Sequence, residues 1–293
     1  MAWAALGTVL LLAEVYTLSR WIGTDAEWWL PQGDYGLEPT QKTMLTTFHV
    51  LSITGTVACV LWPIHQSIRR RTLTIETMVL IGYLSAGWLI PVFTYSGPAI
   101  AYSKYLIGTT GWGQHLPGWH GPDPTTHPVP LFVGWFALAE VMMWTLPTVW
   151  ALRAAVRRWP RLTGTKLILF SFLPALAAEL VLETVMVFSG AYVYPSAPPA
   201  LTLFAGHWYQ IPIPVAFAAA VAYGVIPGLL CHHPESHPLL RSTERLPDRA
   251  RRPIQLMAVI GLSQITFLGL CTAGSVIASL YGVHATDLPP HLQ

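Results

Sequence analysis

The chain has 293 residues, of which 53% are hydrophobic and only 10% are charged, and its mean hydropathy is +0.48. This composition excludes an ordinary water-soluble globular protein. The formal net charge of +2 comes without clustered bases and stacking aromatic residues on a soluble face, which argues against nucleic-acid binding.

Seven apolar stretches are each long enough to cross a bilayer, which requires about 20 residues. In chain order they lie at residues 2–22, 42–66, 75–96, 129–152, 166–189, 207–230 and 253–281. We find no appended soluble module and no internal repeat. The sequence therefore predicts an all-α, polytopic membrane protein with a single domain over residues 1–293, folded as a seven-transmembrane-helix bundle.

The basic residues predict the orientation of this bundle, because cytoplasmic connections carry an excess of Lys and Arg. Thirteen of the 16 basic residues follow the second, fourth and sixth stretches, and only Arg20, Lys42 and Lys104 fall on the other side. The first stretch lacks the basic start and small-residue cleavage site of a signal peptide. We expect a multi-pass protein of the cell membrane with a cytoplasmic N-terminus and the C-terminus outside.

Four glutamates interrupt the apolar stretches: Glu14 in the first, Glu140 in the fourth, and Glu179 and Glu183 in the fifth. A charged side chain in hydrocarbon costs about 2.5–3.5 kcal/mol on insertion scales, so such residues usually face the bundle interior. Glu179 and Glu183 are one helical turn apart on one face, with their Cβ atoms roughly 5–6 Å apart. We expect this pair to share a proton and to act as a general acid toward a weak base such as an alkene.

A structural role is the alternative for each glutamate, with hydrogen bonds to hydroxyls and indoles of neighbouring helices. If the acids are catalytic, Glu140 and Glu14 are second-line candidates that would supply protons or orient the substrate. The predicted topology places further polar side chains in the outer half of the bundle. Those expected to bind substrate, orient the acid or take the final proton are His49, His207, Trp208, Tyr209 and Gln210.

Aromatic residues make up 12% of the chain, which has 13 tryptophans. Ring faces attract cations by roughly 0.5–2 kcal/mol, so a chamber lined with rings would stabilise a carbocation or oxocarbenium ion. Ordinary packing, or an aromatic belt at the membrane interface, is the alternative for any one ring. The rings that we expect to shape a chamber are Trp88, Tyr95, Trp112, Trp119, Trp135 and Trp208.

Several common motifs are absent from the sequence. It has no Asp-rich motif for Mg²⁺-dependent diphosphate ionisation, no phosphate-binding loop and no dinucleotide-binding fingerprint. None of the three lysines lies deep in an apolar stretch, which excludes a retinal Schiff base. We therefore expect chemistry that uses no metal and no cofactor.

Several segments together resemble the AveC-like spirocyclase family of actinobacterial membrane proteins. They are 111–119 (GWGQHLPGW), 130–134 (PLFVG), 190–195 (GAYVYP), 203–212 (LFAGHWYQIP) and the Glu179-x3-Glu183 pair. The resemblance extends from about Trp28 to the end of the chain. In one departure, relatives often carry an acidic residue before the third-helix proline, where this chain has Ile90.

The resemblance implies cyclisation of a hydrophobic natural product that reaches the protein from the membrane lipid. The family is close to the membrane terpene cyclases of drimentine-type pathways, which protonate a farnesyl chain on an indole diketopiperazine. An upstream prenyltransferase would supply that substrate. The alternative is a spiroketal-forming cyclase that closes a polyketide dihydroxyketone. Ile90 and the aromatic content favour the terpene reaction. A transporter or receptor for a lipophilic small molecule is the alternative from another class, although a transporter would be expected to show internal repeats.

Overall fold

The computed structural model describes residues 1–30, 35–95, 100–121, 128–234 and 237–292. Within these residues, seven helical spans are long and apolar enough to cross a membrane, which confirms the predicted all-α, seven-helix fold. The spans are Ala2–Thr24, Pro39–Arg70, Ile75–Val92, Leu131–Arg158, Thr165–Phe188, Ile213–His232 and Arg249–Gly274.

Four spans lie in continuous α-helices, namely α1 (Ala2–Thr24), α2 (Pro39–Arg70), α6 (Thr165–Phe188) and α10 (Asp248–Tyr281). The other three are interrupted by turns of 3₁₀ or π geometry. The third span consists of α3 (Ile75–Leu84), a 3₁₀ segment (Ser85–Leu89) and α4 (Ile90–Tyr95). The fourth consists of a π segment (Leu131–Trp135), a 3₁₀ segment (Phe136–Glu140) and α5 (Val141–Arg158). The sixth consists of α7 (Ile213–Ala219), a π segment (Ala220–Val225) and α8 (Ile226–His232), after which α9 (Pro238–Arg241) leads to α10.

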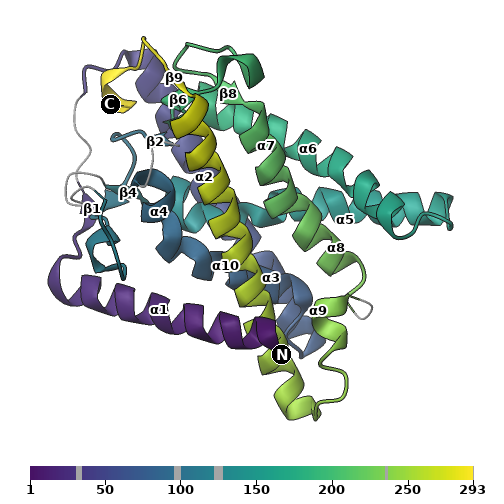
Figure 1. The fold of residues 1–293 in the computed structure, drawn as a ribbon. Coiled ribbons are helices and arrows are strands. Elements are labelled where there is room, and N and C mark those ends of the chain that lie inside the picture. The colour runs from purple at the N-terminus through teal and green to yellow at the C-terminus, as the bar shows by residue number, and fades with distance from the viewer. Residues whose placement is uncertain (31–34, 96–99, 122–127, 235–236, 293) are drawn as a thin grey trace.

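Short strands connect the spans at one end of the molecule, where the C-terminus also lies (Figure 1). All of their pairings are antiparallel, in the orders β1-β3-β4, β2-β5, β6-β9 and β7-β8. The strands are β1 (Trp28–Leu30), β2 (Ala101–Tyr102), β3 (Gly108–Thr109), β4 (Val129–Pro130), β5 (Tyr192–Val193), β6 (Ser196–Ala197), β7 (Thr202–Leu203), β8 (Ile211–Pro212) and β9 (Val283–His284).

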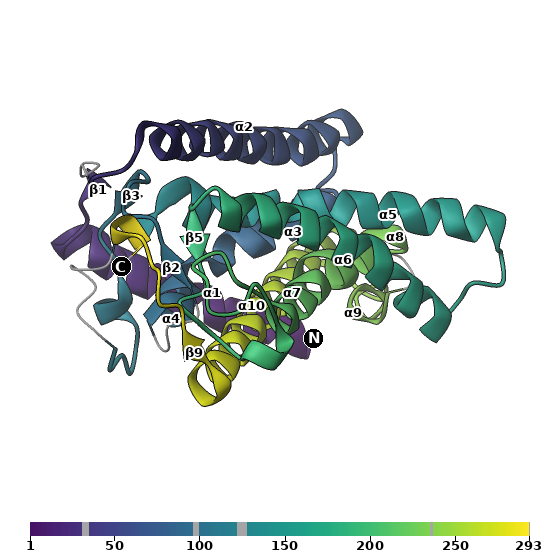
Figure 2. The ribbon, with the colours of Figure 1, turned by 90° about the horizontal axis from the view of Figure 1, so that it is seen from above.

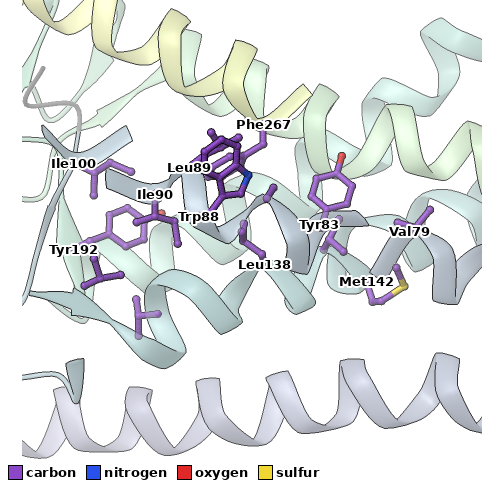
Figure 3. Close-up of a cluster of buried hydrophobic side chains, with 14 of the residues drawn as sticks. Val79, Tyr83, Trp88, Leu89, Ile90, Ile100, Leu138, Met142, Tyr192 and Phe267 are labelled. Carbon is purple, nitrogen blue, oxygen red and sulfur yellow. The ribbon is translucent and has the colours of Figure 1, made fainter. Parts of the chain in front are cut away.

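The interior is built around the third span, whose side chains are mostly buried, whereas α2 lies along one side of the molecule (Figure 2). Figure 3 shows the apolar cluster that fills this interior, with Tyr83, Trp88 and Ile90 of the third span packed against Leu138 and Phe267 of neighbouring helices. Spans that expose apolar side chains, such as α1, have the surface expected of helices that face lipid.

The break in the sixth span follows from Pro227. Proline has no backbone N–H, so it cannot bond the carbonyl of Tyr223 four residues earlier or that of Ala222 five residues earlier. Side chains from other spans donate instead: the hydroxyl of Thr145 to the Tyr223 carbonyl at 3.0 Å, and the phenol of Tyr83 to the Ala222 carbonyl. The two carbonyls that Pro227 cannot bond therefore have donors inside the bundle, as irregular backbone at membrane depth requires.

Side chains also satisfy the carbonyls of the third span around its 3₁₀ segment. The indole of Trp112 donates to the Trp88 carbonyl at 2.8 Å, and that of Trp135 to the Leu84 carbonyl at 3.3 Å. The amide of Gln264 donates to the Ser85 carbonyl at 3.1 Å. Trp135 packs directly against the backbone of the third span at Gly87, where a Cβ would lie 2.1 Å from the ring.

Helices α1 and α10 cross with their backbones in contact. An ideal Cβ at Gly7 would lie 1.9 Å from the carbonyl oxygen of Met257, and one at Gly261 would lie 2.5 Å from that of Trp3. Small residues at a crossing allow this approach in membrane helices, where packing and not water exclusion holds helices together.

The sixth span begins at Ile213 and not near His207, as the apolar run suggested. Pro212 explains the difference, because proline disfavours the helical conformation in Ile211 before it. Pro214 lies in the first turn of α7, where the missing N–H has no partner within the helix. The residues from His207 to Gln210 therefore form turns between β7 and β8 and do not open a helix.

Candidate active site

A cavity of about 90 Å³ lies between the third, fourth, fifth, sixth and seventh spans, beneath the β2–β5 pair. The three interrupted spans line it at their irregular turns, with Ile90, Val133 and Tyr223 among the contributing residues. Breaks of this kind are frequent at functional sites because they re-aim side chains and open space between helices. Among the described residues that line the cavity, Glu179 and Glu183 carry the only acidic groups.

Both carboxyls of this pair are almost completely buried, with 2% of Glu179 and 4% of Glu183 exposed. The indole N–H of Trp144 donates to Oε2 of Glu179 at 2.5 Å. The phenol of Tyr192 donates to Oε2 of Glu183. Oε1 of Glu183 is buried and has no hydrogen-bond partner among the described residues, and the phenol of Tyr194 lies close to the same carboxyl.

Tyrosines from the outer loops close the cavity above the pair. Tyr192 and Tyr194 follow α6 directly, and pairing of β5 with β2 sets Tyr192 opposite Tyr102, which also lines the cavity. Burial, followed by the nearby Glu183 carboxylate, raises the pKa of Tyr192 well above its usual range. The phenol therefore keeps its proton and serves as a donor to Glu183. The amide of Gln210 donates to the Tyr194 carbonyl at 2.8 Å and holds this loop in place.

The second-line acids lie apart from this cavity. Oε1 of Glu140 accepts hydrogen bonds from Ser52 at 3.0 Å and Thr56 at 3.1 Å, so its carboxyl faces α2. Oε2 of Glu14 accepts a hydrogen bond of 3.4 Å from Gln264. Of the four glutamates named from sequence, only Glu179 and Glu183 share this cavity, because the other two are bonded between different pairs of spans.

The polar side chains named from sequence are spread over several places. His49 of α2 is buried, and its ring lies beside that of Phe132 in the fourth span. His207 is 57% exposed, lies 3.3 Å from Asp287 and stacks on Tyr209. Trp208 meets Tyr209 edge-on in the same turn. None of these described side chains lines the cavity that holds the pair.

Two of the tryptophans named from sequence bond the backbone of the third span, and a third belongs to that span. Trp112 and Trp135 donate to its carbonyls, and Trp88 donates to Oε1 of Gln264 at 3.0 Å. Trp88 and Trp119 line a separate open groove between α1 and residues 116–121. The side chain of Tyr95 lies outside the described residues.

The rings that do line the cavity come from other positions. Trp144, Tyr223 and Phe267 lie within spans, and Tyr102, Tyr192 and Tyr194 lie in the loops. Two signals in the sequence point to part of this set. Tyr192 and Tyr194 belong to the GAYVYP segment already singled out, and Trp144 lies one turn after Glu140 in an apolar stretch. Ile90, the residue before the third-span proline, lines the same cavity.

Comparison with models of known protein families shows which family the chain belongs to. The family model described as "Spirocyclase AveC-like" matches residues 69–293, which is more than half of the chain. The chain belongs to the AveC-like spirocyclase family. No curated protein and no solved structure matches this AveC-like protein. Membership indicates a cyclase, and the matched region contains the whole of the cavity described above.

Proposed function

We propose that this AveC-like protein is a membrane-bound terpene cyclase that starts its reaction by protonating a prenyl chain. The observation that carries the proposal is the pair of buried carboxyls, Glu179 and Glu183, facing an apolar and aromatic cavity. The substrate class is a farnesyl chain attached to a hydrophobic body such as an indole diketopiperazine.

In the proposed reaction, a carboxyl of the pair transfers its proton to the terminal double bond of the prenyl chain. The resulting cation is attacked by the neighbouring double bonds, which form the rings. Loss of a proton from a carbon next to the final cation gives an alkene and returns the proton to a carboxylate. The product is therefore an isomer of the substrate with equal mass.

The cavity offers each step a suitable group. The carboxyls of Glu179 and Glu183 line the cavity as the proton source, while Tyr192 holds Oε2 of Glu183. The faces of Trp144, Tyr223 and other lining rings can stabilise the cation. The apolar lining excludes water, which would otherwise capture the cation.

The test uses membranes that contain the protein and a farnesylated indole diketopiperazine, with products analysed by mass and retention time. We expect a product of equal mass, and a decrease of roughly 10²–10⁴-fold in Glu179→Gln or Glu183→Gln. The exposed Glu27→Gln is the control for loss of a carboxylate elsewhere. Activity in washed membranes should persist in EDTA. Near-native rates in both variants at equal membrane levels would refute the acid role of the pair.

A second candidate, spiroketal formation, is favoured by the description of the family as spirocyclases. Here a dihydroxyketone closes two rings and releases one molecule of water, so the product is lighter than the substrate by one water. The same assay with a dihydroxyketone polyketide distinguishes the two reactions by mass alone.

A further inference from the structure

A second cavity lies at the opposite end of the spans and shares no lining residue with the Glu179/Glu183 cavity. Four arginines line it: Arg70 at the end of α2, Arg153 in α5, and Arg251 and Arg252 at the start of α10. They come from three different helices, and the open hollow that they line has a volume of about 510 Å³. Convergence of separate basic segments over one hollow is more than the positive-inside rule requires, because that rule concerns only the side of the membrane.

The backbone adds positive potential to the same cavity. Thr74 and Ile75 form the N-terminal end of α3, and the first turn of α10 also lines the hollow. The N-terminus of a helix carries roughly half a positive charge and favours anions. Arg251 and Arg252 therefore lie where a cation is unfavourable unless an anion is nearby.

The acidic groups in the cavity are fewer than the basic ones. Glu76 and Glu244 line it beside the four arginines, and His232 lines it as well. Within the described residues, no hydrogen bond or ion pair occupies the guanidinium groups of Arg70 and Arg153. Arg252 only reaches the amide oxygen of Gln255, at 3.4 Å. At least three guanidinium groups are thus not neutralised by a carboxylate partner and can be turned toward a ligand.

We propose that this cavity binds a phosphate-bearing anion, through Arg70, Arg153 and Arg252 and the N-terminal end of α3. Arginine suits this role because its planar fork forms paired, charge-assisted hydrogen bonds to phosphate oxygens. The cavity lies at the ends of the spans, which is the level of lipid head groups, so an anionic phospholipid is the source that its position favours. Free phosphate has the same chemistry and is the other source.

The experiment measures binding to the purified full-length protein in neutral detergent. The probes are phosphatidylglycerol, phosphatidylcholine, inorganic phosphate and pyrophosphate, with retained ligand followed by native mass spectrometry and affinity by thermal shift. The double variant Arg153→Gln/Arg252→Gln removes two arginines of the cavity. The matched control is Arg157→Gln/Arg249→Gln, which removes the same charge from the same two helices. All four substituted arginines are exposed, but Arg157 and Arg249 do not line the cavity.

We expect phosphatidylglycerol to bind more tightly than phosphatidylcholine, and the cavity variant to weaken it roughly 10- to 30-fold while the control changes it little. Thr72→Glu, at an exposed position that lines the cavity, provides a second variant that should repel the anion without removing an arginine. Tight binding of phosphate or pyrophosphate with the same variant pattern would support the site and identify the soluble source. Equal losses in the cavity variant and the control, or no selective binding of any anion, would overturn the proposal.

Discussion

The phenol of Tyr192 donates a hydrogen bond to Oε2 of Glu183, so a loop residue holds one carboxyl of the pair from outside the fifth span. Its neighbour Glu179 is held from the fourth span by the indole of Trp144. The two carboxyls therefore share one helix face but have different partners. This difference makes the pair chemically unequal, because an indole bonds Glu179 whereas a phenol bonds Glu183.

We first predict the effect of removing the Tyr192 phenol. Tyr192→Phe leaves a buried carboxyl oxygen without its donor, which costs roughly 1–3 kcal/mol of stability, and it should reduce turnover at least about tenfold. The measurements are thermal unfolding in detergent and product formation in membranes. Tyr105→Phe, in the same group of loops but away from the cavity, is the control and should change neither quantity. Wild-type values for Tyr192→Phe would show that the bond is dispensable.

The second prediction concerns ring faces in the cavity. Trp144→Leu removes a lining ring and the donor to Glu179, and we expect early-terminated products such as monocycles together with a lower rate. Trp135→Leu removes a ring that bonds the third span but does not line the cavity, so it should lower stability without changing the product mixture. Gas chromatography of the products separates the two effects. If the product mixture changed in Trp135→Leu but not in Trp144→Leu, the cation would lie near Trp135 and not near Trp144.

Close packing of α1 on α10 gives the third prediction. Gly7→Ala brings a Cβ within 1.9 Å of the Met257 carbonyl oxygen, and we expect a loss of roughly 1–3 kcal/mol of stability. Gly23→Ala lies on the same helix with nothing within 4 Å of its Cβ, so it should be neutral or stabilising by up to about 1 kcal/mol. Thermal unfolding of both variants in detergent provides the comparison. Equal stability of the two would mean that the helices do not cross at Gly7.

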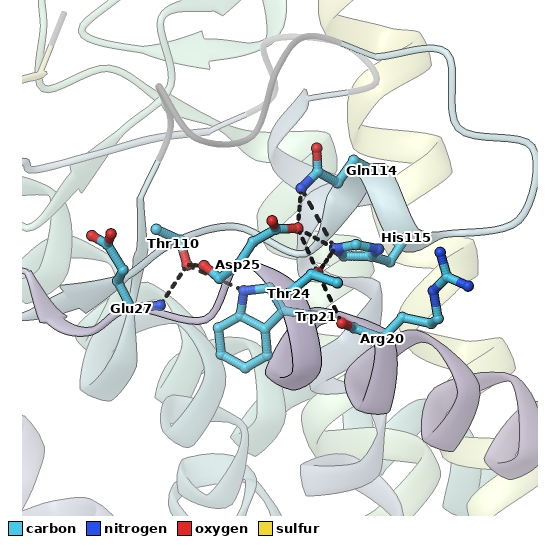
Figure 4. Close-up of polar contacts among 8 residues, drawn as sticks. All are labelled: Arg20, Trp21, Thr24, Asp25, Glu27, Thr110, Gln114 and His115. Carbon is cyan, nitrogen blue, oxygen red and sulfur yellow. Dashed lines mark hydrogen bonds and ion pairs between the residues drawn. The ribbon is translucent and has the colours of Figure 1, made fainter.

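The polar cluster at the end of α1 gives a prediction about pH (Figure 4). Oδ2 of Asp25 accepts hydrogen bonds from Thr24 at 2.8 Å, His115 at 2.6 Å and Gln114 at 2.5 Å. The bond from Thr24, followed by that from His115, lowers the pKa of Asp25 below its usual 3.8. Because the folded pKa is depressed, the stabilisation is present above about pH 4 and is lost as the pH falls through the folded value.

Asp25→Asn should therefore be less stable than the wild type at neutral pH, and the difference between the two should shrink below about pH 4. Melting temperatures of both proteins between about pH 7 and pH 3 provide the measurement. A difference that stays constant, or grows as the pH falls, would show that the charge of Asp25 contributes nothing to folding.

The final prediction concerns orientation. The cavity lined by Arg70, Arg153 and Arg252 places the basic connections on one side of the molecule, and the positive-inside rule predicts that this side is cytoplasmic. A reporter fused after Gln293 should then read as extracytoplasmic. A cytoplasmic signal from this fusion, with a normal level of full-length protein, would reverse the predicted topology.

Hydropathy alone was sufficient to predict the seven spans, because the bilayer sets both the length and the apolar character of a crossing helix. The spacing of Glu179 and Glu183 was sufficient to predict that they share a face, since four residues complete about one turn. Both features depend on residues close together in the chain. The resemblance to the family likewise rested on local segments and is confirmed by the match over residues 69–293.

The partners of each polar group depend on contacts between distant residues, and only the tertiary structure decided them. Glu140 lies at a similar burial to Glu183, yet Ser52 and Thr56 of another span bond its carboxyl and turn it away from the cavity. From the sequence we predicted that Trp112 and Trp135 line the chamber, but in the structure their indoles bond carbonyls of the third span. Inside a membrane every backbone carbonyl needs a donor, and which side chain supplies it depends on how the spans pack, which no local pattern records.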